Sequence, residues 1–438
     1  MALRDRLFSD GLYAFAARIL SMFLAAGLGV LTARVLGSQG RGIYVTPMVD
    51  AAIVSAGFSG LGSATSYFLL RRGAGRAVAR TALLTGALFV VAGACGAAIF
   101  ASIGGTMWAA PAAMISLSGP AALMIATGYA LGTHRVRSSA MLGWANTGTT
   151  LLVMIVVFFV VGMHNATGAI IGWLVATNLT AACVVTWIVL DARRLPPGNA
   201  PLGEFVRYAA RSGLVGLVTL LNYRADVYIV AVLGTPAMLG MYTLAVSAAE
   251  TLLTTTQVTA MITAPHVGSL ADRPAAELAA RSVRHNVLIS GMCCAGLALI
   301  APFAVHLLYG PAFLPVVPPM RVLLIGVFAL SLGGPMSSYF TIRLGRPEVP
   351  LVLASLSALV CIVASFILIP RLGLIGAALA STVAYVGGQT AAITWFALVA
   401  RIDVRTMLIP RRSDVVAYFH VASALFARKR ALLRGISL

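Results

Sequence analysis

Five ionisable residues lie inside long apolar stretches of the sequence, where their side chains could bind an ion or a substrate. They are Arg18, Asp50, Arg224, Asp226 and Glu250. A charged side chain at the centre of a membrane helix costs about 2.5–3.5 kcal/mol on insertion scales, so such residues mark candidate ion or substrate sites. The carboxylates could carry a proton or a cation, and the guanidinium groups could hold an anion such as a phosphate. The structural alternative is ion pairing between helices, for example Arg224 with Asp50.

The negatively and positively charged side chains lie at different depths along their predicted helices. At a rise of 1.5 Å per residue, the three carboxylates fall in the outer half of their predicted spans. Arg224 falls near the middle of its span and Arg18 near the inner end. Arg224 and Asp226 are two residues apart, about 200° around a helix, so we expect their partners on other helices.

The other reactive residue types show no catalytic or metal-binding pattern. The sequence has no HExxH, GxxxxGK[ST] or GxSxG motif. Its five cysteines lie in apolar stretches without CxxC spacing, as small core residues do. We therefore expect no enzyme activity, no cofactor and no metal. Because no nucleotide site is present, active transport would draw on an ion gradient, the membrane potential or a partner.

The composition predicts elements that place these charges within a membrane. Of 438 residues, 60% are hydrophobic and 10% are charged, whereas a soluble domain is about 25% charged. The mean hydropathy is +0.96. These values exclude a soluble enzyme, a disordered chain and a small disulfide-rich domain. Apolar runs predict twelve transmembrane helices at 12–35, 43–69, 80–103, 107–131, 142–162, 167–190, 205–233, 240–265, 286–308, 319–340, 349–369 and 373–399.

The net charge of +19 is better explained by the positive-inside rule, under which cytoplasmic loops are rich in Lys and Arg, than by nucleic-acid binding. With alternate connections assigned to opposite sides, 25 basic residues fall on the side of the termini. Only four fall on the other side: Arg34, Arg41, Arg321 and Arg371. This asymmetry predicts cytoplasmic termini and an even number of spans.

The sequence repeats itself across its two halves. Val35-Leu36-Gly37 and Gly42-Ile43-Tyr44 recur as Val232-Leu233-Gly234 and Gly240-Met241-Tyr242, 197 to 198 residues later. Six spans per repeat give both halves one orientation, the parallel arrangement in which a substrate cavity lies between repeats. We predict an N-terminal bundle over 1–190, a cytoplasmic linker over 191–203 and a C-terminal bundle over 204–400.

A basic cytoplasmic tail over 401–438 follows the last span. Its apolar positions fall on one helical face, in a stretch of about 13 residues that is too short to cross a bilayer. They are Val415, Phe419, Ala422 and Phe426. The tail is predicted to form an interfacial helix on anionic lipid, the alternative being a frayed end.

Several ordered motifs resemble the polysaccharide (O-unit) flippases of the multidrug/oligosaccharidyl-lipid/polysaccharide exporter superfamily. The similar stretches are 32–44 (TARVLGSQGRGIY), 60–64 (GLGSA), 221–226 (LNYRAD), 239–250, 307–310 (LLYG) and 376–381 (GAALAS). The resemblance covers nearly all of residues 5–400. It implies two six-helix bundles around a V-shaped cavity in the bacterial inner membrane. The implied substrate is an undecaprenyl-pyrophosphate-linked oligosaccharide, moved outward for exopolysaccharide, capsule or O-antigen synthesis.

The resemblance also implies roles for the buried charges. Arg18 and Arg224 match, by position, cationic residues that receive the pyrophosphate, and the match for Arg18 is positional alone. Independently of the resemblance, H⁺ or Na⁺ entering through Asp50, Asp226 or Glu250 would add to the drive for transport by antiport, the alternative for these carboxylates being charge pairing. Moving two negative charges outward against 100 mV, inside negative, is downhill by about 4.6 kcal/mol. Implied partners are membrane lipids and a polysaccharide polymerase, with no nucleic acid.

Three other functions remain open from the sequence. A cation-coupled multidrug exporter would bind organic cations, which buried arginines repel. A lipid II flippase is disfavoured because this sequence has only two intramembrane arginines and twelve predicted spans. A scaffold that recruits glycan-synthesising enzymes would use the motifs for packing alone.

Overall fold

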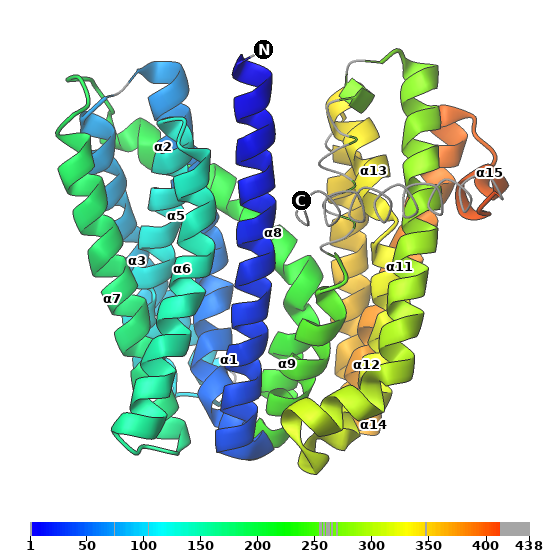
Figure 1. Ribbon diagram of the computed structural model, residues 1–438, viewed down its shortest axis with the longest axis horizontal. Helices are drawn as coiled ribbons and strands as arrows, with labels where there is room; N and C mark the ends of the chain where they lie inside the picture. Colours follow the sequence, from blue (N-terminus) through cyan, green and yellow to red (C-terminus); the bar gives the residue numbers. More distant parts are fainter. Residues whose placement is uncertain are drawn as a thin grey trace, which may run out of the picture. The chain divides into compact units, whose positions relative to one another are not determined.

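The computed structural model describes residues 2–411 except 74, 104, 254, 255, 257, 258, 260–262, 264, 265, 269 and 347. All regular elements among these residues are helices (Figure 1). This follows from the apolar sequence, because a backbone in lipid must satisfy its hydrogen bonds within each segment. The elements are α1 (Ala2–Ser55), η1 (Ala56–Phe58), α2 (Ser59–Arg72), α3 (Ala77–Ile103), α4 (Ala110–Ser116), α5 (Ser118–Gly132), α6 (Val136–Ile155), η2 (Val156–Val160), α7 (Ala166–Ala192), α8 (Leu202–Leu233), α9 (Pro236–Glu250), α11 (Asp272–Tyr309), η3 (Pro311–Val316), α12 (Val317–Leu330), α13 (Gly333–Ser338), η4 (Tyr339–Arg343), α14 (Glu348–Ala400) and α15 (Val404–Leu408).

Nine helical segments of the described chain are long and apolar enough to cross a membrane. Two of them, Tyr13–Leu70 and Glu348–Ala400, are far longer than the roughly 20 residues that one crossing needs. Each is broken at one glycine with a left-handed φ, Gly37 (φ 65°) and Gly373 (φ 56°), which other residues rarely adopt. The breaks divide these two segments into four, and α9 adds the start of another. The arrangement is consistent with the twelve predicted spans, although part of 240–265 lies outside the described residues.

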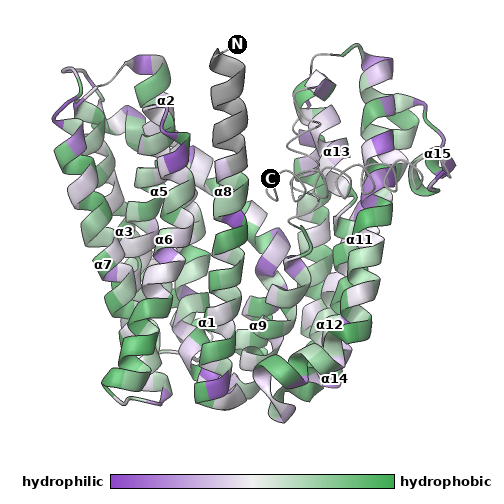
Figure 2. Cartoon of the chain, in the orientation of Figure 1, coloured by the Kyte–Doolittle hydropathy of each residue, from purple (hydrophilic) through white to green (hydrophobic). Residues whose placement is uncertain are grey.

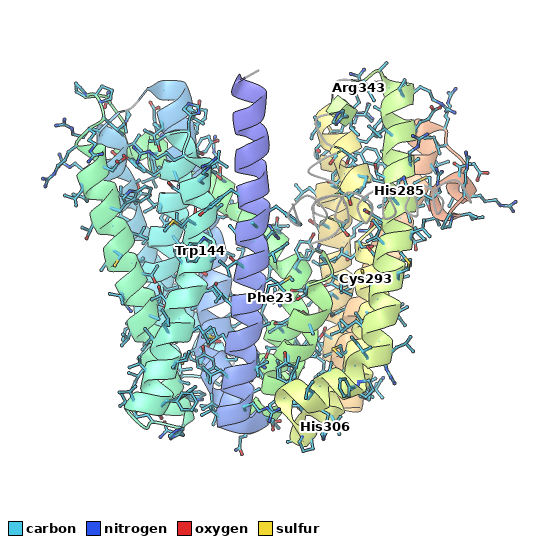
Figure 3. All side chains as sticks on the ribbon, viewed as in Figure 1. Phe23, Trp144, His285, Cys293, His306 and Arg343 are labelled. Carbon is cyan, nitrogen blue, oxygen red and sulfur yellow. The ribbon has the colours of Figure 1, made fainter. Side chains whose placement is uncertain are left out.

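The predicted boundaries were wrong where polar residues extend a helix beyond its apolar part. The span predicted at 286–308 belongs to α11, which begins at Asp272. Figure 2 shows hydrophilic colour near that end of α11 and hydrophobic colour over the rest. Arg343 lies beside that end (Figure 3), and its Nε is 2.6 Å from Asp272 Oδ1. An apolar window does not detect this extension, because charged residues such as Asp272 and Arg273 are interspersed with the small apolar residues that pack into the core, among them Ala276 and Val283.

The helices group into two compact units, each assembled from separated parts of the chain. Unit 1 contains 1–246, 302–319 and 358–380, and unit 2 contains the remaining segments. The core of unit 1 includes the buried side chains of Phe58, Leu61, Tyr129 and Phe205. In unit 2, Tyr339, Phe340 and Phe396 form the centre of a second core against alanines of α11. The predicted division into bundles over 1–190 and 204–400 stays a prediction.

Glycines allow the helices of unit 1 to approach closely. A Cβ on Gly128 of α5 would lie 2.1 Å from the carbonyl oxygen of Gly62 on α2. A Cβ on Gly60 would lie 1.9 Å from the carbonyl oxygen of Ala209 on α8. Small residues at such crossings bring backbones together in membranes, where no hydrophobic effect drives association.

Gly128→Ala is therefore expected to destabilise unit 1 by about 1–3 kcal/mol, the usual cost of overpacking. The thermal unfolding midpoint of the purified protein in detergent measures this effect. Gly57→Ala is the matched control, since a Cβ on Gly57 meets no atom within 4 Å. Equal midpoints for the two variants would contradict the proposed tight crossing.

The repeated glycine motifs pack against each other within unit 1. A Cβ on Gly42 would overlap the carbonyl group of Pro236, and one on Gly240 would lie 2.3 Å from the carbonyl oxygen of Ser38. Ser38 precedes Gly42 by four residues, as Pro236 precedes Gly240. Each repeat therefore places its glycine against the equivalent position of the other, which is consistent with the predicted two-fold repeat.

Candidate functional site

Asp50 is a buried carboxylate on the second half of α1, beyond the break at Gly37. Only 1% of the residue is exposed, and the Thr106 hydroxyl donates to Asp50 Oδ2 at 3.0 Å. The pairing of Arg224 with Asp50, considered as the structural alternative, stays a prediction. A carboxylate held by a neutral hydroxyl is costly to bury as an anion.

Asp226 is a second buried carboxylate, on α8. Its exposed fraction is 2%, Oδ1 accepts the backbone N–H of Val227 at 2.8 Å, and Oδ2 accepts the hydroxyl of Tyr242 at 2.5 Å. Tyr242 is on α9, which confirms that Asp226 has a partner on another helix. The sequence had shown Tyr242 as a repeated motif residue, but its hydrogen bond depends on the crossing of α8 and α9.

The two arginines are more accessible than the aspartates. Arg18 is exposed on α1, and Arg224 is half-buried on α8, within unit 1. Neither side chain is isolated from its neighbours. Helices α1 and α8 pack against each other. The two aspartates are therefore shielded inside unit 1, whereas the two arginines are partly or fully accessible.

Glu250 is the last residue of α9 and is half-buried. It belongs to unit 2, whereas the four other candidates belong to unit 1. The structure therefore brings together no single cluster of all five residues within one unit.

Arginines assigned to the outer side from the sequence act as helix-stabilising donors. Arg41 is 7% exposed, and its Nη1 donates to the carbonyl oxygen of Gly240 at 2.7 Å. Arg34 donates to the carbonyl oxygens of Leu307 and Leu308 near the end of α11. Carbonyls in the last turn of a helix lack intrahelical partners, and arginine satisfies them. The role of Arg41 was missed because only the crossing at Gly240 reveals its burial.

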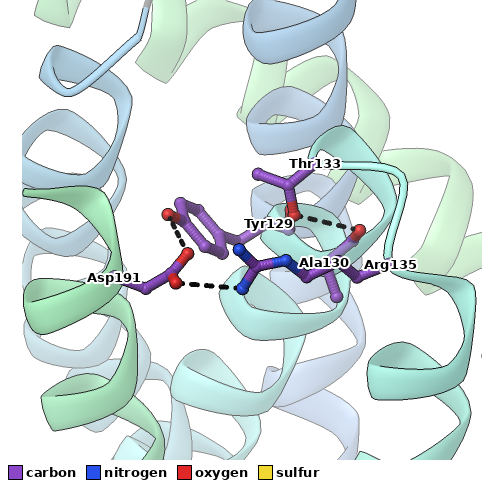
Figure 4. A network of polar contacts seen from close by, with 5 residues as sticks. All are labelled: Tyr129, Ala130, Thr133, Arg135 and Asp191. Atoms are coloured by element: carbon purple, nitrogen blue, oxygen red, sulfur yellow. Dashed lines mark hydrogen bonds and ion pairs between the residues drawn. The ribbon is translucent and has the colours of Figure 1, made fainter. Parts of the chain in front are cut away.

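A polar network at one end of unit 1 was also missed from the sequence. Asp191 Oδ2 accepts the hydroxyl of Tyr129 at 2.9 Å, and Asp191 Oδ1 accepts Arg135 Nη1 at 3.0 Å (Figure 4). Only 8% of the Asp191 side chain is exposed. The sequence placed Asp191 at the start of the linker, whereas it lies within α7. The network ties α7 to the end of α5 and the start of α6.

Asp191→Asn is expected to lower the free energy of unfolding by about 1.5–3 kcal/mol, because charged hydrogen bonds at a buried acceptor are lost. Thermal unfolding in detergent measures this loss. Asp272→Asn is the matched control, since the Asp272 side chain is 67% exposed and exposed ion pairs contribute little. A larger loss at Asp272 than at Asp191 would contradict the stabilising role of the network.

The described residues contain no group of three or more His, Cys, Asp or Glu side chains that could hold a metal ion. Asp50 and Asp226 lie on separate helices, with hydroxyl or backbone donors around them.

A family model described as "Polysaccharide biosynthesis protein" matches residues 79–318, more than half of the chain. The chain belongs to this family. The matched range includes Arg224, Asp226 and Glu250, whereas Arg18 and Asp50 precede it. The family is the one that the sequence motifs resemble. No curated protein matches the chain.

Solved structures similar to this family member are transporters and a flippase. The lipid II flippase MurJ in an inward closed conformation gives a TM-score of 0.72 at 12% identity, over 95% of this chain and 93% of that chain. An inward-facing multidrug resistance transporter of the MATE family gives 0.69 at 16% identity, over 87% and 94%. A MOP superfamily transporter from Pyrococcus furiosus gives 0.59 at 14% identity, over 89% and 94%. These similarities show that the chain has the same fold as these proteins, that of an all-helical, multi-pass membrane protein.

Proposed function

We propose that the protein flips undecaprenyl-pyrophosphate-linked oligosaccharides from the inner to the outer leaflet of the bacterial cytoplasmic membrane. The observation that carries this proposal is a pair of accessible arginines on neighbouring helices, α1 and α8, in a polysaccharide biosynthesis family. A pyrophosphate carries about two negative charges, and arginine binds phosphate with paired, permanently charged donors. In this account Arg18 captures the headgroup near the cytoplasm and Arg224 holds it near the middle of the membrane.

Asp50 and Asp226 are proposed to exchange a proton or Na⁺ during the return of the empty carrier, with Glu250 as a third candidate. Their burial supports this role, since a buried carboxylate gains most from binding a cation. Orientation with cytoplasmic termini rests on the asymmetry of basic residues. The two six-helix bundles over 1–190 and 204–400 would then alternate access to a central cavity. The interfacial helix predicted for the tail lies outside the described residues, as do its apolar positions.

Lipid extraction from a deletion strain tests the proposal. Glycan linked to undecaprenyl pyrophosphate is expected to accumulate in the inner leaflet, surface polysaccharide is expected to fall, and the wild-type chain is expected to restore both. Normal surface polysaccharide with altered sensitivity to organic cations would instead identify a drug exporter. Accumulated lipid II would identify a peptidoglycan flippase.

A further inference from the structure

A cavity of about 430 Å³ lies in unit 1 between the start of α3 and the end of α7. Its rim carries three arginines, Arg76, Arg80 and Arg193, and its wall includes Leu84 and Val189. All three arginines are exposed residues. In the part of the chain that the structure describes, none of them forms an ion pair with a carboxylate. The acidic residue nearest in sequence to Arg193, Asp191, is already bonded to Tyr129 and Arg135.

Backbone contacts fix the geometry of this rim. The backbone N–H of Arg76 donates to the carbonyl oxygen of Pro196 at 2.8 Å, and Arg76 Nη2 donates to the carbonyl oxygen of Arg193 at 3.0 Å. Thr81 Oγ1 donates to the carbonyl oxygen of Ala200 at 2.9 Å. The connection between α7 and α8 is thereby tied to the start of α3, which holds the arginines in one place.

An apolar stripe leads away from the rim along α3. Leu84, Leu88 and Val91 are all exposed, and their spacing of four and three residues places them on one helix face. Val189 of α7 is exposed on the cavity wall. A positive rim continuous with an apolar stripe is the complement of a phosphate headgroup attached to acyl chains.

We propose that this cavity binds an anionic phospholipid of the inner leaflet, with its phosphate at the three arginines and its acyl chains along the α3 stripe. The charge of the rim favours an anionic over a zwitterionic headgroup. A free phosphate would need no apolar wall. The inference rests on the proposed orientation, which places this end of unit 1 at the cytoplasm, and on no assumption about the transported substrate.

Lipid retention by the purified full-length protein tests the inference, with native mass spectrometry as the readout. The probes are dioleoylphosphatidylglycerol, dioleoylphosphatidylcholine and inorganic phosphate. We expect phosphatidylglycerol to be retained in preference to phosphatidylcholine. Replacing all three rim arginines by glutamine is expected to weaken phosphatidylglycerol binding by roughly a hundredfold, at about fivefold per arginine.

The matched control replaces Arg346, Arg401 and Arg405 by glutamine, which removes the same number of exposed positive charges elsewhere and should leave retention unchanged. Because Arg76 also makes a structural contact, Arg80→Glu provides a second test without disturbing that contact. Equal retention of both phospholipids, or undiminished retention in the rim variants, would overturn the proposal. Full competition by inorganic phosphate would reassign the cavity to free anions. Since no transport is measured, these outcomes are separable from failure of the flippase proposal.

Discussion

Arg224→Ala is expected to reduce flipping of the lipid-linked glycan by about 10- to 100-fold. If Arg224 binds the pyrophosphate as proposed, the substitution removes charge-assisted hydrogen bonds to a phosphate, which contribute about 1.5–3 kcal/mol each. Surface polysaccharide in the complemented deletion strain, normalised to the amount of protein in the membrane, measures the loss. Arg224 is half-buried, so its removal should change thermal stability far less than transport.

Two further variants sharpen this prediction. Arg224→Lys retains one positive charge without paired donors and should recover part of the activity. Arg371→Ala removes an exposed arginine on α14 and should behave as the wild type. Full transport by Arg224→Ala at normal protein levels would exclude this arginine from the substrate site.

Asp50→Asn is expected to uncouple transport from the ion gradient while preserving the fold. Asparagine retains the shape of the side chain and can still accept the Thr106 hydroxyl, and it removes a buried ionisable group. At a membrane potential of 100 mV, the loss of one coupled charge removes about 2.3 kcal/mol of driving force, roughly fiftyfold in the accumulation ratio. The dependence of flipping on an imposed pH or Na⁺ gradient in proteoliposomes measures this change.

Thr106→Ser retains the hydroxyl donor and is the matched control, expected to keep gradient dependence. Asp226→Asn distinguishes the two carboxylates, because the backbone N–H of Val227 and the Tyr242 hydroxyl already hold Asp226. Unchanged gradient dependence in Asp50→Asn would assign coupling to another residue. A collapse of thermal stability in this variant would instead indicate a structural role for the carboxylate.

The sequence predicted an all-helical membrane protein and the approximate positions of its helices, because bilayer thickness requires apolar runs of a defined length. Its errors are at the ends, where α11 continues for fourteen residues before the predicted start at 286. The observed turn between the first two spans is also shorter than the turn predicted between residues 35 and 43. One glycine with positive φ, Gly37, breaks α1, and helix resumes immediately after it.

The candidate site was predicted as a set of residues but not as a geometry. Residue type alone identified Asp50 and Asp226, since charge is costly in an apolar helix. Their partners, Thr106 and Tyr242, carry hydroxyls of types common in any helix, so only the packing of the chain reveals them. The cavity between α3 and α7 was missed for a similar reason. Its arginines were counted separately as basic residues of two different connections.

Flipping by the purified protein in proteoliposomes tests the central claim most directly. Vesicles containing an undecaprenyl-pyrophosphate-linked oligosaccharide are treated with a membrane-impermeant glycan-modifying enzyme, with a membrane potential imposed across the bilayer. We expect wild-type protein to expose the protected half of the glycan, reversal of the potential to slow exposure, and Arg224→Ala to fail to expose it. No exposure by a folded wild-type protein, together with uptake of an organic cation, would contradict the proposed flippase function.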